Sequence, residues 1–203
     1  MSLSLPIVVE SERLVVRPVE ERDLPALLLV NGDDETTRFL PYRSWRDLAD
    51  GRAWLERMCA LSSGGQSIQY VVTDRSSELA IGTCLLFRYE ASSARAELGY
   101  VLGRSYWGRG LMREALVAVI SCAFGPYELR RLEAEVDPLN RASGRLLESL
   151  GFVREGLLRK RWVDKGIAHD TIIYGLLSDE WRGGNGTANP RTNGNSPGGS
   201  GLS

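Results

Sequence analysis

Two glycines, Gly108 and Gly110, flank Arg109 where a loop runs into a segment with the apolar spacing of a helix. Glycine adopts backbone conformations that other residues avoid, and it lets the backbone come close to a ligand. The first turn of a helix leaves backbone N–H groups unpaired, and the helix dipole adds partial positive charge there. Together these features predict a pyrophosphate-binding loop. Two glycines at this spacing are also typical of a simple tight turn into a helix.

The residues after this loop argue against two other phosphate-binding motifs. A Walker A loop has lysine and then serine or threonine after its second glycine, where this chain has Leu111 and Met112. A dinucleotide-binding fingerprint needs a third glycine, and Arg113 occupies that position. The loop also follows a run of strands and does not open a βαβ unit. Binding of ATP or NAD is therefore the least favoured function of the loop.

The elements that must position this loop follow from apolar periodicity and from the turn residues between segments. The sequence predicts strands at residues 12–18, 67–73, 78–89, 95–102, 129–136, 152–158 and 171–177. It predicts helices at residues 20–30, 34–40, 47–61, 111–124 and 140–150, and a polar turn around Gly166. Short polar connections favour antiparallel pairs, so the order of elements predicts an α+β domain with a mixed, mostly antiparallel sheet.

Length and composition indicate one ordinary globular domain. The chain has 203 residues, of which 43% are hydrophobic and 25% are charged, and its formal net charge is -1. We expect one domain over residues 1–182 and a disordered tail over residues 183–203, which hold glycine, asparagine and serine without an apolar pattern. The near-neutral charge argues against nucleic-acid and membrane partners, although a local basic patch is expected near bound phosphates.

Cysteine usage and the first residues favour a cytoplasmic protein. Cys59, Cys84 and Cys122 lie far apart in apolar stretches, so we expect three buried small side chains and no disulfide. Residues 1–10 lack the basic and apolar regions of a signal peptide, and no window approaches the roughly 18 apolar residues of a membrane-spanning helix. We find no spacing typical of metal ligands.

The glycine-rich loop resembles a family motif once its neighbours are included. Residues 107–116 (W-G-R-G-L-M-R-E-A-L) are similar to the acetyl-CoA loop of the GNAT superfamily, in the form found in its ribosomal-protein N-terminal acetyltransferase branch. Ser105 departs from the fuller motif, which has glutamine or arginine there. Residues 140–143 (N-R-A-S), 151–156 (G-F-V-R-E-G) and 12–18 (E-R-L-V-V-R-P) also resemble family patterns. The resemblance spans about residues 10–182.

This resemblance implies a GNAT-like sheet of six or seven strands flanked by helices. Two central parallel strands, at 95–102 and 129–136, would splay apart to hold acetyl-CoA as the cosubstrate. The loop would bind the pyrophosphate, and the backbone of the first strand would bind the pantetheine arm. The Asn140 side chain would either bind the pantetheine arm or hold the second strand in place. The implied acetyl-CoA-binding residues are Tyr100, Val101, Leu102, Trp107, Gly108, Arg109, Gly110, Leu111, Met112, Asn140 and Ser143.

The implied reaction transfers the acetyl group directly from a thioester to a primary amine, which calls for a base and a proton donor. Glu97 is the first candidate base because its strand is expected to line the site, and Glu133 and Glu135 on the neighbouring strand are alternatives. All three could instead face solvent or form salt bridges. Many family members have a tyrosine where this chain has Leu147. Ser143 matches the serine of the ribosomal-protein branch, so it is either the donor to the CoA sulfur or a serine packed in a helix turn.

The acceptor is the least determined part of this prediction. The resemblance favours the N-terminal α-amine of a protein or peptide, whose pKa of about 7.7–8.0 lies well below that of lysine, about 10.4. Acetylation of a small amine, such as an antibiotic or a metabolite, is the alternative, and a non-catalytic acyl-CoA-binding protein is a third hypothesis. Monomers and homodimers both occur in the family. Surface, turn or packing roles are expected for His169, Trp45, Trp54, Trp162 and Trp181.

Overall fold

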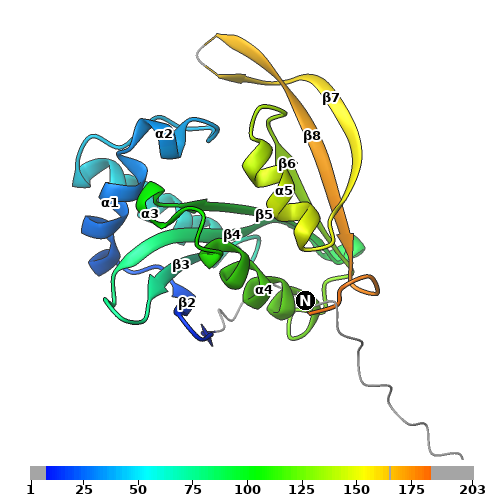
Figure 1. The fold of residues 1–203 in the computed structure, drawn as a ribbon, viewed down its shortest axis with the longest axis horizontal. Coiled ribbons are helices and arrows are strands. Elements are labelled where there is room, and N and C mark those ends of the chain that lie inside the picture. The colour runs from blue at the N-terminus through cyan, green and yellow to red at the C-terminus, as the bar shows by residue number, and fades with distance from the viewer. Residues whose placement is uncertain (1–7, 165, 184–203) are drawn as a thin grey trace, which may run out of the picture.

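The computed structural model describes residues 8–164 and 166–183, which fold around one twisted sheet (Figure 1). The strands are β1 Val9–Glu10, β2 Leu14–Pro18, β3 Ile68–Asp74, β4 Ala80–Glu90, β5 Arg95–Leu102, β6 Arg131–Val136, β7 Val153–Asp164 and β8 Ile167–Leu177. The α-helices are α1 Leu24–Asn31, α2 Asp34–Thr37, α3 Leu48–Ser63, α4 Leu111–Phe124 and α5 Arg141–Ser149. Short 3-10 helices lie at Glu21–Asp23, Ala91–Ser93 and Arg104–Tyr106. The α+β class predicted from the sequence is confirmed.

The described strands form one eight-stranded sheet in the order β1-β2-β3-β4-β5-β6-β8-β7. Neighbouring strands are antiparallel except β5 and β6, which are parallel. The chain between β5 and β6 contains α4, because parallel neighbours need a long crossover connection. The sequence predicted six or seven strands. The additional strand is β1, an edge strand of two residues that is too short to show apolar alternation.

Strands β7 and β8 form a long hairpin that projects beyond the rest of the sheet (Figure 1). Their pairing continues as far as Asp164 and Ile167, well past the shorter strands predicted at 152–158 and 171–177. Trp162, Val163 and Ile167 in this outer part are exposed. No core covers this outer part, so its residues need not alternate between apolar and polar, and the sequence shows no strand signal there.

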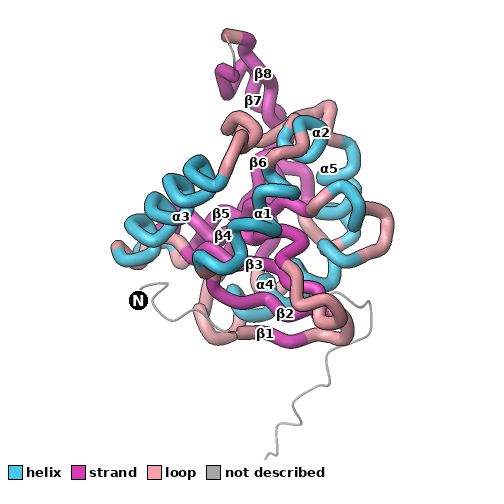
Figure 2. The backbone as a smooth tube through the Cα atoms, turned by 90° about the vertical axis from the view of Figure 1, so that its left-hand side faces the viewer, coloured by secondary structure: helices cyan, strands magenta, loops and turns pink. Residues whose placement is uncertain are grey.

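The helices cover both faces of the sheet (Figures 1 and 2). Successive side chains of a strand point to opposite faces, and neighbouring residues of β3 show which helices lie on each. Val72 belongs to the main core, which includes buried residues of α4 and α5 such as Leu116 and Leu147. Val71 packs in a second core with Trp54 of α3 and apolar residues of α1. The sheet is therefore the middle layer of a three-layer domain.

Helix α2 is shorter than the sequence predicted. It ends at Thr37, and the predicted helix ran to residue 40. Pro41 disfavours the helical conformation of the residue before it, and the Leu40 N–H donates to the Thr37 carbonyl at 2.9 Å in a turn. Residues 38–41 consequently leave the helix and help to line the cleft described below.

Three further expectations have mixed outcomes. Cys84 and Cys122 are buried, as predicted. Cys59 is exposed on the solvent side of α3, so the prediction of a buried thiol is wrong for Cys59. The tail predicted at 183–203 lies outside the described residues, apart from Gly183. Within the described residues, no helix combines the length and apolar character needed to cross a membrane.

Candidate active site

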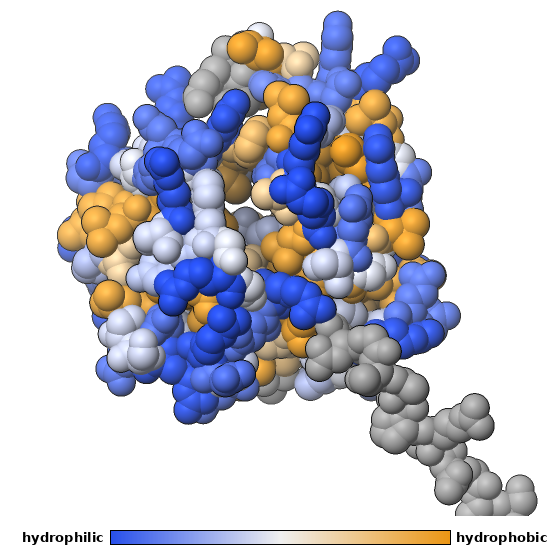
Figure 3. All heavy atoms as spheres, in the orientation of Figure 1, coloured by the Kyte–Doolittle hydropathy of each residue, from blue (hydrophilic) through white to orange (hydrophobic). Residues whose placement is uncertain are grey.

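A cleft opens where the parallel strands β5 and β6 separate. The two strands pair over only three residues each, and the last pair joins Glu97 to Glu133. Beyond this point β5 continues to Leu102 and β6 to Val136 without pairing to each other. The cleft has a volume of about 1230 Å³, and Figure 3 shows this face of the molecule hollowed near its centre. The two central strands therefore splay apart, as the resemblance implied.

The loop before α4 faces this cleft with little side-chain cover. Gly108 and Gly110 have positive φ angles of +71° and +73°, which other residues rarely adopt. Gly110 is the N-cap of α4 and has no side chain to bond the first-turn N–H groups. Gly108 lines the cleft, and a Cβ placed on it would have no atom within 4 Å. The start of α4 thus offers N–H donors, positive helix dipole and open space, which suits a phosphate group.

The other loop residues have distinct roles. Leu111 and Met112 are buried in the main core and line the cleft at the start of α4. Trp107 folds back onto the sheet, and its Nε1 donates to the Leu102 carbonyl at 2.7 Å. This bond ties the loop to the end of β5 and engages the Leu102 carbonyl within the protein. Arg109 is exposed next to these residues.

Glu114 of α4 holds the loop in place through contacts with the residues just before β2. Its carboxylate accepts hydrogen bonds from Ser11 Oγ at 2.6 Å and from the Arg13 backbone N–H at 2.9 Å, and it forms a salt bridge with the Arg13 guanidinium at 2.6 Å. Arg13 Nη1 also donates to the Arg109 carbonyl at 2.9 Å. Burial alone would raise the pKa of Glu114, but these donors outweigh it and hold the pKa below its ordinary value. The start of β2 thereby supports the loop.

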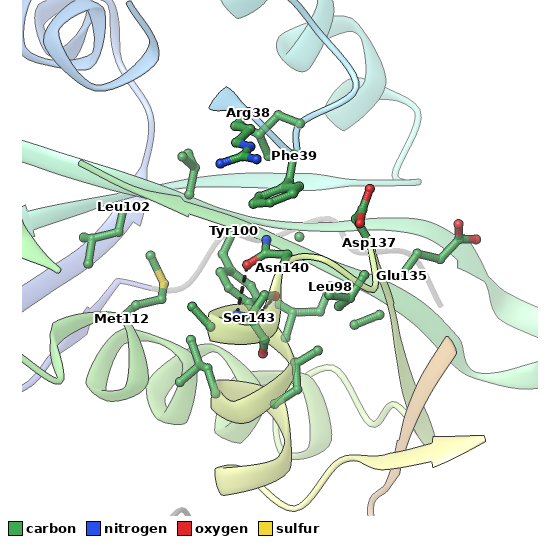
Figure 4. Close-up of a pocket in the computed structure, with 18 of the residues that line it drawn as sticks. Arg38, Phe39, Leu98, Tyr100, Leu102, Met112, Glu135, Asp137, Asn140 and Ser143 are labelled. Atoms are coloured by element: carbon green, nitrogen blue, oxygen red, sulfur yellow. Dashed lines mark hydrogen bonds between the residues drawn. The ribbon is translucent and has the colours of Figure 1, made fainter. Parts of the chain in front are cut away.

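Three side chains meet on the cleft wall at the start of α5 (Figure 4). Asn140 is the N-cap of α5, and its Oδ1 accepts from the Ser143 N–H at 3.1 Å. Ser143 Oγ lies 2.7 Å from the hydroxyl oxygen of Tyr100, which comes from β5. Burial raises the pKa of Tyr100, so its phenol keeps its proton at neutral pH. Leu147, at the position where many family members have a tyrosine, is fully buried.

Glu97 lies on the opposite face of β5 from Tyr100. Ala96 and Leu98 point into the main core, and alternation along the strand turns Glu97 the other way. The Glu97 side chain lines the cleft, is 12% exposed, and pairs with Arg88 at 2.7 Å. Burial raises the pKa of Glu97, and the Arg88 guanidinium opposes part of this shift. A largely buried carboxylate with a raised pKa is suited to taking a proton from an amine.

The neighbouring carboxylates on β6 have other partners. Glu133 forms salt bridges of 2.8 Å with two arginines, one on β5 and one on β6, and it does not line the cleft. Glu135 lines the cleft, but it accepts from Trp162 Nε1 at 2.6 Å and lies 3.5 Å from Arg88. Glu135 thus joins the β7–β8 hairpin to the rim of the cleft. Of the three carboxylates, Glu97 and Glu135 line the cleft and Glu133 does not.

Comparisons with known proteins bear on the identity of this site. A family model of the acetyltransferase (GNAT) domain matches residues 13–153. The chain belongs to the GNAT acetyltransferase family. It is 35% identical over 173 residues to the uncharacterized N-acetyltransferase p20 of Bacillus licheniformis, covering 85% of this chain and 97% of that protein.

Two relatives fall in the ribosomal-protein branch of the GNAT family. The [ribosomal protein uS5]-alanine N-acetyltransferase of Escherichia coli is 30% identical over 183 residues, covering 86% of this chain and 92% of that protein. The structure of the ribosomal-protein-S5-alanine acetyltransferase from Vibrio fischeri matches with a TM-score of 0.73 at 26% identity, covering 87% and 99% of the two chains. These matches confirm the resemblance to that branch, and the chain is an N-acetyltransferase.

The residues that the GNAT resemblance assigned to the site come together in the structure. All of them line the cleft except Arg109, which lies beside it in the loop. The glycine loop leaves space at the start of α4, and β5 beyond Glu97 has no strand partner on its β6 side. Both features fit acetyl-CoA, whose pyrophosphate needs N–H donors and whose pantetheine arm can pair with a free strand edge. Within residues 8–164 and 166–183, no cluster of three or more His, Cys, Asp or Glu could hold a metal ion.

Sequence reasoning missed several cleft residues. Arg88 adopts a positive φ of +51° at a β-bulge in β4, and no pattern in the sequence marks that position. Trp162 was expected only to pack, but it bonds Glu135 at the rim. His169 was expected on the surface or in a turn, whereas it lies in β8 and lines the cleft, with Nδ1 3.5 Å from Asp137. The bulge in β4 brings Arg88 to the site, and contacts of the β7–β8 hairpin with β6 bring Trp162 and His169 there.

The support that Glu114 gives to the loop leads to a stability prediction. We expect Glu114→Gln to lower the free energy of unfolding by about 1–3 kcal/mol near neutral pH, because hydrogen bonds to a charged carboxylate are lost. The pKa of Glu114 is lowered on folding. Its contribution is therefore present above the unfolded pKa of about 4.3 and is lost as the pH falls through the folded pKa.

Urea unfolding of the wild type and the variant at several pH values measures this effect. The gap between them should be widest near neutral pH and should close below about pH 4. Glu56→Gln, which changes an exposed carboxylate of α3, is the control and should shift stability by less than about 0.5 kcal/mol. A gap that stays constant into acid would contradict the charge-assisted role of Glu114.

Proposed function

We propose that this GNAT enzyme transfers the acetyl group of acetyl-CoA to the N-terminal α-amine of a protein or peptide, by direct attack in a ternary complex. The observation that carries the proposal is that the gap between β5 and β6 connects the two faces of the sheet. Tyr100 and Ser143 lie on the α4–α5 side of this gap, and Glu97 lies on the other side. The donor can therefore approach from one face and the acceptor from the other.

The α4 side of the cleft would hold the donor. Acetyl-CoA supplies an acetyl thioester that is reactive toward amines. The loop glycines and the first turn of α4 would bind the pyrophosphate through backbone N–H groups. The backbone of Tyr100 and Val101 would pair with the pantetheine arm like an added strand. Arg113 and Arg141 line the cleft and would balance the phosphate charge, as the expected basic patch requires.

The reaction needs a neutral amine and a stabilised leaving group. Glu97 takes the proton of the ammonium group, directly or through water. A bond forms between the amine nitrogen and the acetyl carbon, and the carbon–sulfur bond breaks with its electron pair going to sulfur. The nitrogen loses two protons in total: Glu97 takes the first before the attack, and the second is released as the amide forms and balances the proton that the thiolate gains. A backbone N–H beside Val101 would donate to the acetyl oxygen, and the Ser143 hydroxyl would donate to the sulfur.

The acceptor side of the cleft has an acidic entrance. Residues 38–41 and the hairpin residues Trp162 and Val163 flank it, and Figure 4 shows Arg38 and Phe39 across the cleft from Ser143. Glu135 and Asp137 contribute negative charge, which attracts an ammonium group. The likeness to two ribosomal-protein alanine acetyltransferases supports an N-terminal amine as the acceptor.

A CoA-release assay with a panel of amines tests this proposal. The panel contains peptides that begin with Ala, Ser, Met or Asp, the same peptides with blocked N-termini and one free lysine, polyamines and aminoglycosides. We expect turnover on free peptide N-termini and none on the blocked peptides, because the α-amine is the more readily deprotonated group. Turnover on polyamines or aminoglycosides alone would overturn the N-terminal assignment in favour of a small-molecule acceptor.

A further inference from the structure

The contact between Tyr100 and Ser143 has no role in the reaction as described so far. The two hydroxyl oxygens are 2.7 Å apart, and both residues line the cleft. Tyr100 is half-buried in β5, and its ring packs against the main core. From the sequence, only the backbone of Tyr100 was expected to bind the donor. The chain also lacks the tyrosine that many family members have at the position of Leu147.

The surroundings of Ser143 determine what this contact can do. The Ser143 N–H is held by Asn140 Oδ1, so the backbone of the residue is fixed in the first turn of α5. Its hydroxyl can rotate, and a serine hydroxyl carries one hydrogen and accepts through two lone pairs. When the Tyr100 hydroxyl donates to Ser143 Oγ, the hydrogen of Ser143 must point elsewhere. Because Ser143 stands on the cleft wall, the cleft is the direction left open.

We propose that Tyr100 is a positioning residue that donates a hydrogen bond to Ser143 Oγ and thereby aims the Ser143 hydroxyl at the sulfur of CoA. The inference rests on the proposed placement of the CoA sulfur beside Ser143. In this proposal a tyrosine of β5 acts at the CoA sulfur, where many family members have a tyrosine of α5 at the position of Leu147. When the carbon–sulfur bond breaks and its electron pair goes to sulfur, the aimed hydroxyl stabilises the thiolate. The thiolate then gains one proton through solvent, which balances the proton that the nitrogen releases as the amide forms.

The raised pKa of Tyr100 agrees with this role. A phenol that resists ionisation remains a hydrogen-bond donor over the whole working range of pH. A free thiol has a pKa of about 8.5, so the Tyr100 phenol is the weaker acid of the two. Tyr100 therefore does not itself give up a proton to the thiolate. Orientation of Ser143, and not proton transfer from Tyr100, is therefore the effect to measure.

A binding experiment without any acceptor tests the proposal. The affinities of CoA and of desulfo-CoA, in which hydrogen replaces the thiol, are measured by calorimetry from about pH 7 to 10. A donor at the sulfur lowers the pKa of the bound thiol, so the ratio of CoA affinity to desulfo-CoA affinity should rise with pH, by about tenfold or more in the wild type. We expect Tyr100→Phe and Ser143→Ala each to remove most of this rise.

Tyr70 provides a matched control. Its hydroxyl oxygen lies 2.7 Å from that of Tyr127, so Tyr70→Phe also removes a phenol hydroxyl from a short contact, but outside the cleft. We expect Tyr70→Phe to keep the wild-type rise in the affinity ratio. Thermal unfolding of each variant shows whether Tyr100→Phe costs more stability than Tyr70→Phe. Desulfo-CoA affinity should be the same in all folded variants, because that ligand has no sulfur to contact.

Turnover gives the second measurement, with the acceptor that the amine panel identifies. Tyr100→Phe should lower kcat by about tenfold and leave the KM for acetyl-CoA unchanged. In a Ser143→Ala background, Tyr100→Phe should have no further effect, because the tyrosine acts through the serine. Additive losses in the double variant would overturn the proposal.

An unchanged affinity ratio in Tyr100→Phe would also overturn it. Because the affinity ratio needs no acceptor, it separates this inference from the choice of acceptor. If no amine in the panel were acetylated and the affinity ratio still depended on Tyr100, the proposed function would be contradicted. The role of Tyr100 would still hold.

Discussion

Replacing Glu97 with glutamine is expected to lower kcat/KM by about 10²- to 10³-fold near neutral pH, the range for loss of a general base. Glutamine keeps the size of the side chain and its ability to bond Arg88, so the cleft should hold its shape. The substitution removes the group that takes the ammonium proton. The KM for acetyl-CoA should not change, because Glu97 lies on the face of β5 opposite to Tyr100 and Ser143.

The pH dependence separates a base from a merely structural carboxylate. A base works only when it is ionised, and the pKa of Glu97 is raised by burial. Wild-type kcat/KM should therefore fall as the pH decreases through the pKa of Glu97. An α-amine loses its proton unaided above about pH 8, so the defect of Glu97→Gln should shrink there. A defect of constant size from acid to alkaline pH would show that Glu97 is not the base.

Two neighbouring carboxylates serve as controls for Glu97. Glu133→Gln changes a residue that pairs with arginines outside the cleft, so we expect close to wild-type kcat/KM. Glu135→Gln weakens the bond from Trp162 that joins the hairpin to the rim. We expect it to raise the KM for the acceptor more than it lowers kcat, because it disturbs the entrance and not the proton transfer. A larger loss of kcat for Glu135→Gln than for Glu97→Gln would move the base to Glu135.

The parts of this site that the sequence predicted are those set by local rules. The loop was recognisable because Gly108 and Gly110 occupy positions with positive φ immediately before an amphipathic helix. Asn140 and Ser143 were assigned through their likeness to a family pattern, and the structure shows a local reason for their spacing, because the N-cap side chain reaches the N–H three residues on. Such features depend on a few consecutive residues, so the order of residues along the chain is enough to show them.

The parts that the sequence did not predict depend on how strands and helices meet in three dimensions. Tyr100 meets Ser143 only because α5 packs against the splayed half of β5, and these residues are 43 positions apart. Arg88 reaches Glu97 because of a bulge that gives it an unusual backbone conformation. The outer hairpin, with Trp162, lacks apolar alternation because it packs against no core, and Trp162 meets Glu135 only through the pairing of β8 with β6. Each of these features is a product of register and twist, which composition and periodicity do not determine.

Substitution of Gly108 is expected to have the other large effect, on binding of the donor. Gly108→Ala should weaken acetyl-CoA binding by about 10- to 100-fold, the value of one hydrogen bond to a charged group. The residue has a φ of +71°, and a Cβ added to it would meet no atom within 4 Å, so the new methyl group would enter the space assigned to the pyrophosphate. The positive φ also costs an alanine about 1–2 kcal/mol, which favours a shift of the loop N–H groups.

The variant Gly166→Ala is the control that separates a direct effect on the pyrophosphate site from a general loss of stability. Gly166 has a φ of +81° and equally open surroundings, but it lies at the hairpin turn and does not line the cleft. Gly166→Ala should therefore lower the melting temperature about as much as Gly108→Ala and leave acetyl-CoA affinity unchanged. Acetyl-pantetheine, which has no pyrophosphate, sharpens the comparison, because its KM should be the same for Gly108→Ala and the wild type. If Gly108→Ala weakened both donors equally, the loop would not be the pyrophosphate site, and the donor would have to lie elsewhere along β5.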